Sequence, residues 1–404
     1  MHMGKIALCN GQLILPGGVL QSGTLFIEAG QIVGIQSEQW PQLGPEWQQY
    51  DVQGSYIAPG FIDIHLHGGG GADFMDGTVE GFLTAARSHA RYGTTALYPT
   101  TLTSEISDLD RTIASFVEAR QHEYSGAQLM GMHLEGPYFA VSQRGAQDPR
   151  YIRDPNPEEY QGVVERHGGH IARWSAAPEL PGAMTFADYI KRHGIMPAIA
   201  HTDAVYEDIV EAVAHGYHLV THLYSGMSGV TRKQGFRFAG VIETALLLDE
   251  LWVELIADGI HVPASLLKLV YKVKGPERIV LITDAMRASG MPEGPSVLGS
   301  LTNGLAVIVE DGVAKLPDRS AFAGSVATGM DLVRNMNELA EVPIEQAVRM
   351  ATENPAQVMG LPKKGRLAPG MDADVVVFDT HFKVQCTMVG GKTVYQHEAL
   401  DSLK

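Results

Sequence analysis

The stretch Phe61-Ile-Asp-Ile-His-Leu-His67 is a short apolar run that ends in two histidines. Side chains on a β-strand alternate between faces, so His65 and His67 would share one face. Two imidazoles on one face suit Zn²⁺ or another borderline divalent metal. Four glycines, Gly68 to Gly71, follow and allow a sharp turn or a close approach to a ligand. By itself the motif is weak, because a strand histidine more often packs or hydrogen-bonds than binds a metal.

The same arrangement recurs at four more places, where a ligand-type side chain ends an apolar run. The residues are Glu135 after Leu129-Met-Gly-Met-His-Leu, His201 after Ile195-Met-Pro-Ala-Ile-Ala, His222 after Leu219-Val-Thr, and Asp284 after Ile279-Val-Leu-Ile-Thr. Each carboxylate alone could be the N-cap of a following helix. Together, three histidine sites and two carboxylates indicate one shared metal centre. His133 lies on the face of Glu135 and is expected to support it, whereas His89, on a predicted helix, is expected to be solvated.

Apolar runs alternate with amphipathic stretches through the middle of the chain. Amphipathic segments at 79–92, 186–193 and 207–215 lie between several of the runs. Such alternation indicates a parallel sheet buried on both faces, and eight units predict an α/β fold of the (β/α)8 TIM-barrel type. A doubly wound open sheet is the alternative, but only a closed barrel brings the five ligand-bearing strand ends to one point. The eight expected strands are 61–65, 95–98, 129–134, 171–176, 195–200, 218–221, 252–257 and 279–283.

Both ends of the chain have a different pattern of short strands and glycine turns. Segments 25–28 and 31–35 near the start resemble segments 374–378, 382–384 and 392–395 near the end. We expect residues 1–57 and 358–404 to form one small β-sandwich domain. Residues 58–357 would form the catalytic barrel, finished by a helix at 344–350.

Composition excludes several classes of partner. The 404 residues carry a formal net charge of −16, so no basic footprint for nucleic acid is expected. No run approaches the roughly 18 apolar residues of a membrane helix. Cys9 and Cys386 are the only cysteines, which excludes a disulfide framework. With no apparent signal peptide, these features predict a cytoplasmic protein.

The motifs around the ligands are similar to those of the amidohydrolase superfamily, and most of all to its amino-sugar-phosphate deacetylases. The resemblance covers nearly the whole chain. It implies that Glu135, His201 and His222 bind a core metal, that His65 and His67 support a second, and that Asp284 transfers protons. One or two divalent ions per subunit are implied, with zinc first and Fe, Mn, Co or Ni as alternatives. The matching stretches are Ala58-Pro-Gly-Phe-Ile-Asp-Ile-His-Leu-His67, His133-Leu-Glu-Gly-Pro137, Ala177-Pro-Glu179, His201-Thr-Asp203, Thr221-His-Leu-Tyr224, Ile256-Ala-Asp-Gly-Ile-His261, Ile282-Thr-Asp284 and Gly365-Arg-Leu-Ala-Pro-Gly-Met-Asp-Ala-Asp374.

The resemblance also implies a reaction, which is removal of the acetyl group from N-acetyl-D-glucosamine 6-phosphate by metal-activated water. Relatives usually carry Asn-Ala in place of Ser225-Gly226, and a shorter loop before their phosphate-binding arginine. Arg237 aligns best with that arginine, and Arg232 is the other candidate. In relatives this arginine and the equivalent of His261 come from a partner subunit, so a homodimer is expected. The implied pocket residues are Ala146, Ser225, Gly226, Arg237, His261, Phe322, Ala323 and Gly324.

Two other functions remain open from the sequence. One is a related hydrolysis, such as deacetylation of N-acetylgalactosamine 6-phosphate or of another N-acyl substrate. The stretch Ser175-Ala-Ala-Pro-Glu179 lacks the lysine that cyclic-amide hydrolases carbamylate. The other is a non-catalytic scaffold with a structural metal, but such a metal is usually enclosed by four protein ligands.

Overall fold

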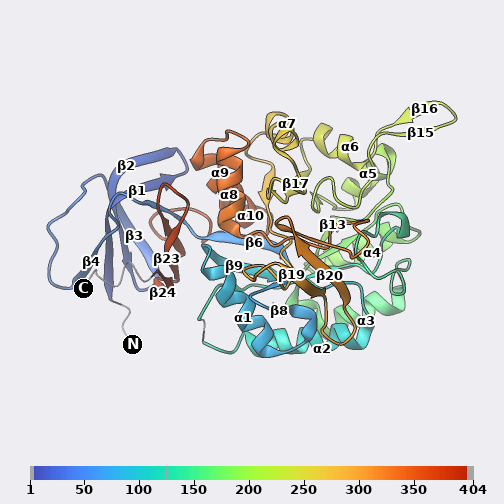
Figure 1. The fold of residues 1–404 in the computed structure, drawn as a ribbon, viewed down its shortest axis with the longest axis horizontal. Helices are drawn as coiled ribbons and strands as arrows, with labels where there is room; N and C mark the ends of the chain where they lie inside the picture. The colour runs from blue at the N-terminus through green and yellow to red at the C-terminus, as the bar shows by residue number, and fades with distance from the viewer. Residues whose placement is uncertain (1–3, 124, 398–404) are drawn as a thin grey trace.

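The body of the molecule is a curled parallel sheet surrounded by helices (Figure 1). The computed structural model describes residues 4–123 and 125–397, so the predicted domain residues 1–3 and 398–404 lie outside the described residues. Each of the eight predicted runs contains a parallel strand, and run 129–134 is divided into two at Met130-Gly131. The strands are β6 (Phe61–Leu66), β9 (Thr94–Pro99), β10 (Gln128–Leu129), β11 (Met132–Glu135), β12 (Ile171–Ala176), β13 (Met196–Ile199), β14 (Leu219–Val220), β17 (Trp252–Leu255) and β18 (Ile279–Leu281).

These strands form two hydrogen-bonded groups, ordered β10-β9-β6 and β11-β12-β13-β14-β17-β18. Thr100 and His133 form a parallel bridge between the groups. At the other edge, the backbone N–H of Asp284 donates to the carbonyl of His65 (2.9 Å). The carboxyl ends of the parallel strands therefore face the same end of the molecule.

Helices follow most of the strands and pack on them through apolar faces. On α1, Phe82 and Ala85 are buried against the sheet, and the side chain of Thr78 caps the first turn. His89 lies on the same buried face, where its Nε2 donates to the carbonyl of Gly68 (2.8 Å). The expectation that His89 is solvated is therefore wrong. The helices are α1 (Val79–Ala90), α2 (Ile106–Ala119), α3 (Pro157–His167), α4 (Ala183–Arg192), α5 (Tyr206–Ala214), α6 (Val241–Leu247), α7 (Ala264–Lys274), α8 (Gly329–Glu338), α9 (Ile344–Ala351) and α10 (Glu353–Val358), with single 3₁₀ turns η1 (Phe74–Asp76), η2 (Val141–Gln143) and η3 (Gly168–His170). Among the described residues, none of these helices has the length and apolar character needed to cross a membrane.

Both chain ends enter one separate sheet of eight strands, on the left in Figure 1. Strand β22, from the C-terminal end, pairs with β5, from the N-terminal end. The predicted strand at 382–384 is wrong, because Phe382 lies in a turn with a φ of 59°. The strands are β1 (Lys5–Leu15), β2 (Gly18–Glu28), β3 (Gln31–Gln36), β4 (Trp47–Asp51), β5 (Tyr56–Pro59), β22 (Val375–Phe378), β23 (Val384–Val389) and β24 (Lys392–Gln396).

Small antiparallel elements lie at the carboxyl end of the parallel sheet. The short pair β7 (Gly68–Gly69) and β8 (Ala72–Asp73) follows β6. The hairpin of β15 (Thr231–Lys233) and β16 (Phe236–Phe238) projects away from the body at the upper right of Figure 1. A three-stranded sheet, β19 (Gly294–Leu298), β20 (Leu305–Glu310) and β21 (Val313–Lys315), follows Asp284. Sequence reasoning predicted neither the hairpin nor this sheet.

Arg287 anchors the three-stranded sheet to the body. Its two terminal nitrogens, Nη2 and Nη1, pair with the carboxylate of Asp76 (2.8 and 3.0 Å). They also donate to the carbonyls of Gly71 and Gly299 (2.9 and 2.8 Å). The side chain is 8% exposed. Since its partners come from η1, the glycine turn and the end of β19, this one residue holds three segments together.

We predict that Arg287→Met destabilises the fold by about 3 kcal/mol, because breaking a largely buried ion pair leaves its carboxylate unpaired. Thermal unfolding should show a lower melting temperature. The matched control is Arg334→Met, which removes an exposed pair with Asp331 and should cost less than about 1 kcal/mol. Equal effects of the two substitutions would contradict an anchoring role for Arg287.

Candidate active site

Six ligand-type side chains converge at the carboxyl end of the parallel strands. His65 and His67 come from β6 and the residue after it, and Glu135 ends β11. His201, His222 and Asp284 follow β13, β14 and β18 within three residues. All six are buried. The convergence follows from the fold, because parallel strands deliver their C-terminal side chains to one edge.

The six side chains form two groups, each with its ligand atoms within 4.8 Å of one another: His65, His67 and Asp284 in one, and Glu135, His201 and His222 in the other. In the second group, Glu135 Oε1 lies 3.3 Å from His201 Nε2 and 3.1 Å from His222 Nε2. In the first, Asp284 Oδ1 lies 3.1 Å from His67 Nε2. Glu135 also approaches both strand histidines, with Oε1 3.5 Å from His65 Nε2 and Oε2 3.4 Å from His67 Nε2. The two groups therefore share one carboxylate between them.

The chemistry of this donor set fits a divalent cation. His65 Nε2 and Asp284 Oδ1 are buried, lie 3.5 Å apart and have no hydrogen-bond partner among the described residues. A buried polar atom without a partner costs roughly 1–3 kcal/mol, which a bound ion would offset. Imidazole and carboxylate ligands suit zinc and its transition-metal neighbours.

Opposite charges in the two groups stabilise one another. Burial opposes ionisation of Glu135, but its electrostatic interactions with His65, His201 and His222 hold its pKa well below the usual range. Burial likewise opposes ionisation of Asp284, while His65 and His67 lower its pKa. Burial disfavours the charged form of His67, but the nearby carboxylates of Asp284 and Glu135 raise its pKa to about 9. Both carboxylates are therefore ionised at neutral pH.

Three of these residues have strained backbones. The φ angles are 46° at His201, 31° at His222 and 49° at Asp284. Non-glycine residues rarely adopt this left-handed region, and such strain gathers at functional sites. Hydrogen bonds hold the strained turns in place. For example, Asp284 donates its N–H to His65 and accepts from the N–H of Ser325 (2.7 Å).

Further polar residues support the ligands, and sequence reasoning missed three of them. Gln147 Nε2 donates to Glu135 Oε2 (2.7 Å). Glu254 Oε2 accepts from His65 Nδ1 (3.3 Å), and Glu254 is paired with Arg173. Burial opposes ionisation of Glu254, but the charge of Arg173 lowers its pKa. Arg173 and Glu254 could have been found from the sequence, because each is a charged residue inside an otherwise largely apolar run, 171–176 and 252–257.

His133, expected beside Glu135, bonds instead to two neighbouring strands. Its Nδ1 hydrogen-bonds Thr100 Oγ1 (3.1 Å), and its Nε2 hydrogen-bonds Ser175 Oγ (2.7 Å). The side chain is fully buried. His133 therefore supports the site by joining strands beneath it.

Above the ligands lies a cavity of about 240 Å³. His67, Glu135, His201, His222 and Asp284 form part of its lining, whereas His65 is not among the lining residues. His261 lines one side, with its Nδ1 held by Asp258 Oδ2 (2.6 Å) and its ring against Phe322. Of the predicted pocket residues, those that line the cavity are Ala146, Ser225, Gly226, His261, Phe322 and Gly324.

Two predicted pocket residues lie elsewhere in this chain. Ala323 is fully buried in an apolar cluster with Met286 and Ala288. Arg237 lies opposite Arg232 on the projecting β15–β16 hairpin, and both are exposed. Neither arginine lines the cavity, because the hairpin extends away from the body. In contrast, His261 lines the cavity of its own chain.

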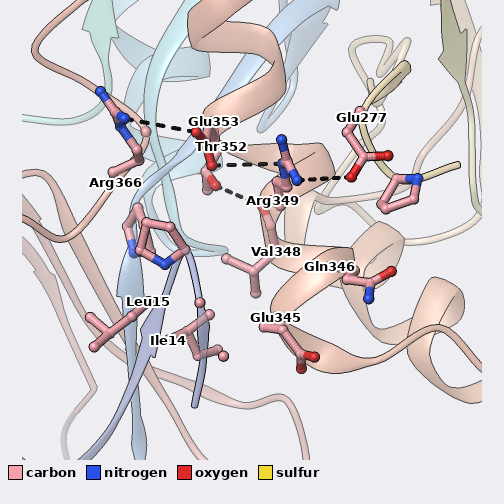
Figure 2. A pocket seen from close by; sticks show the side chains of 16 residues that line it. Ile14, Leu15, Glu277, Glu345, Gln346, Val348, Arg349, Thr352, Glu353 and Arg366 are labelled. Carbon is pink, nitrogen blue, oxygen red and sulfur yellow. Dashed lines mark hydrogen bonds and ion pairs between the residues drawn. The ribbon is translucent and has the colours of Figure 1, made fainter. Parts of the chain in front are cut away.

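A second cavity, of about 200 Å³, lies at the opposite end of the sheet, between the β1–β2 turn and α9 (Figure 2). Arg349 in this cavity pairs with Glu277 (3.1 Å) and Glu353 (3.7 Å). No predicted site residue lines it. Its position near the amino ends of β6 and β18 is typical of structural residues in a barrel.

Comparison with known proteins agrees with the geometry. The model of the amidohydrolase family matches residues 56–394. The chain is 36% identical over 344 residues to N-acetylglucosamine-6-phosphate deacetylase of Lysinibacillus sphaericus, covering 85% of this chain and 87% of that protein. It is 33% identical to N-acetylgalactosamine-6-phosphate deacetylase of Escherichia coli O157:H7, covering 83% and 87% of the two chains. A Mycobacterium smegmatis N-acetyl-D-glucosamine-6-phosphate deacetylase variant, solved in complex with N-acetyl-D-glucosamine-6-phosphate, is similar in structure. Its TM-score is 0.88 at 30% identity, covering 98% of this chain and 100% of that one.

Proposed function

The chain belongs to the amidohydrolase family, and from this we propose that it hydrolyses N-acetyl-D-glucosamine 6-phosphate to glucosamine 6-phosphate and acetate. The observation that carries the proposal is the pair of ligand groups at the base of the cavity. Deacetylases of this substrate are similar over most of the chain. We also propose that the enzyme works in the cytoplasm, which the two free cysteines support.

We propose that Glu135, His201 and His222 hold one divalent ion, and that His65 and His67 contribute to a second beside Asp284. Zinc is the first candidate, followed by Fe, Mn, Co and Ni. When bound, such an ion lowers the pKa of water and polarises the amide carbonyl. An arrangement of buried imidazoles around ionised carboxylates supports this assignment.

Asp284 is the proposed proton carrier. Its carboxylate is ionised, and its Oδ1 faces the ligand groups, 3.1 Å from His67 Nε2 and 3.5 Å from His65 Nε2. It would accept a proton from the attacking water and return it to the departing amine, which is otherwise a poor leaving group. His261 would bind a phosphate or carbonyl oxygen of the substrate through Nε2, since Asp258 holds its Nδ1.

We propose that the parallel strands form one complete (β/α)8 barrel over residues 58–357, and that residues 1–57 with 358–404 form a β-sandwich domain. The bridge between Thr100 and His133 and the hydrogen bond from Asp284 to His65 support closure of the barrel. Pairing of β22 with β5 supports one domain made from both ends.

We propose that the active unit is a homodimer in which the β15–β16 hairpin of one subunit supplies cations to the other. Among the described residues, the cavity lining contains no lysine or arginine, although a phosphate needs a cation or several donors. The hairpin carries Arg232, Lys233 and Arg237 on an exposed projection, and Phe236 at its turn is 73% exposed. Such a projection suits contact with a second chain.

The proposed reaction predicts acetate release from N-acetylglucosamine 6-phosphate by the metal-loaded protein. Acetate would be measured on that substrate, on its galactosamine epimer and on unphosphorylated N-acetylglucosamine, with bound metal determined in the same samples. We expect the highest kcat/KM for the glucosamine phosphate and loss of activity after chelation. A higher value for the galactosamine epimer would reassign the substrate. Bound metal without release of acetate from any of the three would contradict the proposed activity.

Asp284→Asn should retain bound metal and reduce kcat by about 10²–10⁴-fold, the usual contribution of a positioned acid or base. The amide keeps the size of the side chain but cannot accept the proton. Metal analysis and turnover should be measured on the same preparation. Asp258→Asn serves as the comparison, because it alters the support of His261 rather than the proton carrier. Near-normal kcat in metal-loaded Asp284→Asn would contradict the assigned role.

Arg237→Ala should raise KM for the phosphorylated substrate far more than for the unphosphorylated sugar, because the guanidinium would pair with the phosphate. Arg232→Ala, at the opposite position of the same hairpin, is the matched control. A larger effect of Arg232→Ala would transfer the role to that residue. Equal losses for both sugars in both variants would exclude a phosphate contact from this hairpin.

A further inference from the structure

A buried ion pair lies beneath the six ligands and touches both ligand groups. Arg173 on β12 and Glu254 on β17 are each fully buried. Neither side chain lines the cavity. Burying such a pair carries a large desolvation cost, so its contacts need an explanation.

The two carboxylate oxygens of Glu254 have different partners. Oε1 accepts from Arg173 Nη1. Oε2 accepts from His65 Nδ1 (3.3 Å) and from the backbone N–H of His222 (3.2 Å). One oxygen atom therefore contacts a residue of each ligand group.

Arg173 orients that carboxylate by reaching two further strands. Its Nη2 donates to Thr221 Oγ1 (2.8 Å), next to His222, and its Nη1 lies 3.4 Å from the carbonyl of Ile64, next to His65. The guanidinium is planar and presents its donors in a fixed fork. Since its partners adjoin both ligands, it fixes Glu254 relative to both strands.

These contacts have two consequences for the ligands. A carboxylate can only accept, so His65 must carry its proton on Nδ1. The lone pair of His65 Nε2 is then directed at the ligand group, where that atom lies 3.5 Å from both Glu135 Oε1 and Asp284 Oδ1. The bond to the N–H of His222 also holds a backbone with a φ of 31°.

We propose that Glu254 is a positioning residue shared by both metal-binding groups, so that the geometry of one group is tied to that of the other. The inference rests on the proposed metal centre. Hydrogen bonds behind metal ligands fix their tautomer and orientation, and their loss typically weakens metal binding about 10- to 100-fold. Glu254 differs from a support of a single ligand because its removal affects both groups.

The test measures the affinity of the purified, demetallated protein for Zn²⁺ by competition with a chromophoric chelator. Glu254→Gln should weaken zinc binding about 10- to 100-fold. The double variant Arg173→Met with Glu254→Leu should show the same loss, and it removes both buried charges, so it is expected to fold. The matched control is Asp374→Asn, which breaks another largely buried pair, with Lys364, in the terminal sheet.

A second comparison separates the contact of Glu254 with His65 from its contact with His222. In the background of His65→Asn, zinc would bind the remaining group of Glu135, His201 and His222. Adding Glu254→Gln should weaken that binding further, because the bond to His222 is lost. If Glu254→Gln caused no further loss of zinc affinity in this background, Glu254 would act through His65 only. That result would overturn the shared role.

The outcomes distinguish this inference from the proposed function. Zinc affinity that is unchanged in Glu254→Gln, with a lower melting temperature as in Asp374→Asn, would make the ion pair purely structural and overturn the inference alone. Failure of the wild-type protein to bind any divalent metal would overturn the metal centre and the inference together.

Discussion

The site depends on the contacts between one buried carboxylate, that of Glu135, and four histidines. Its Oε1 lies within 3.5 Å of an imidazole nitrogen of His65, His201 and His222, and its Oε2 lies 3.4 Å from His67 Nε2. A buried charge of this kind persists only when its surroundings compensate it. The parallel strand order satisfies that condition, since it brings the C-terminal ends of distant segments to the same edge.

Charge compensation by buried polar groups continues below these side chains, in the space enclosed by the curled parallel sheet. TIM barrels usually fill this space with branched apolar side chains, but here buried His133, Ser175, Thr221, Arg173 and Glu254 form a hydrogen-bonded network. An apolar cluster from several strands, including Trp252, Ile256, Val280 and Ile282, accompanies this network. On β12, Arg173 and Ser175 join the network, whereas Trp174 between them packs edge-on against Phe186 of α4. Strand periodicity therefore places the polar side chains of β12 on one face and the helix-facing Trp174 on the other.

Much of this architecture could be predicted from the sequence because each ligand ends an apolar run. The positions of the eight strands and of the six ligand-type side chains follow from that signal. Side chains inside the runs were harder to interpret, since a charge such as Glu254 acts through contacts with strands far away in sequence. His89 was misassigned because a helix position does not reveal which face packs inward. The β15–β16 hairpin projects away from the body (Figure 1), so its sequence shows little beyond turn residues and charge.

The close approach of Gly226 to His201 limits which residue fits this position of the cavity wall. It has a φ of 59°, and an added Cβ would lie 2.7 Å from His201 Nδ1 and 2.8 Å from the carbonyl of Gln143. That carbonyl accepts from His201 Nδ1 (2.8 Å), so a side chain would disturb the bond that orients a ligand. With this backbone, alanine at the position would require the loop or the imidazole to move. Gly226 therefore belongs to a cavity wall that packs closely on His201, so the shape of the pocket is tied to the geometry of the side chains beneath it.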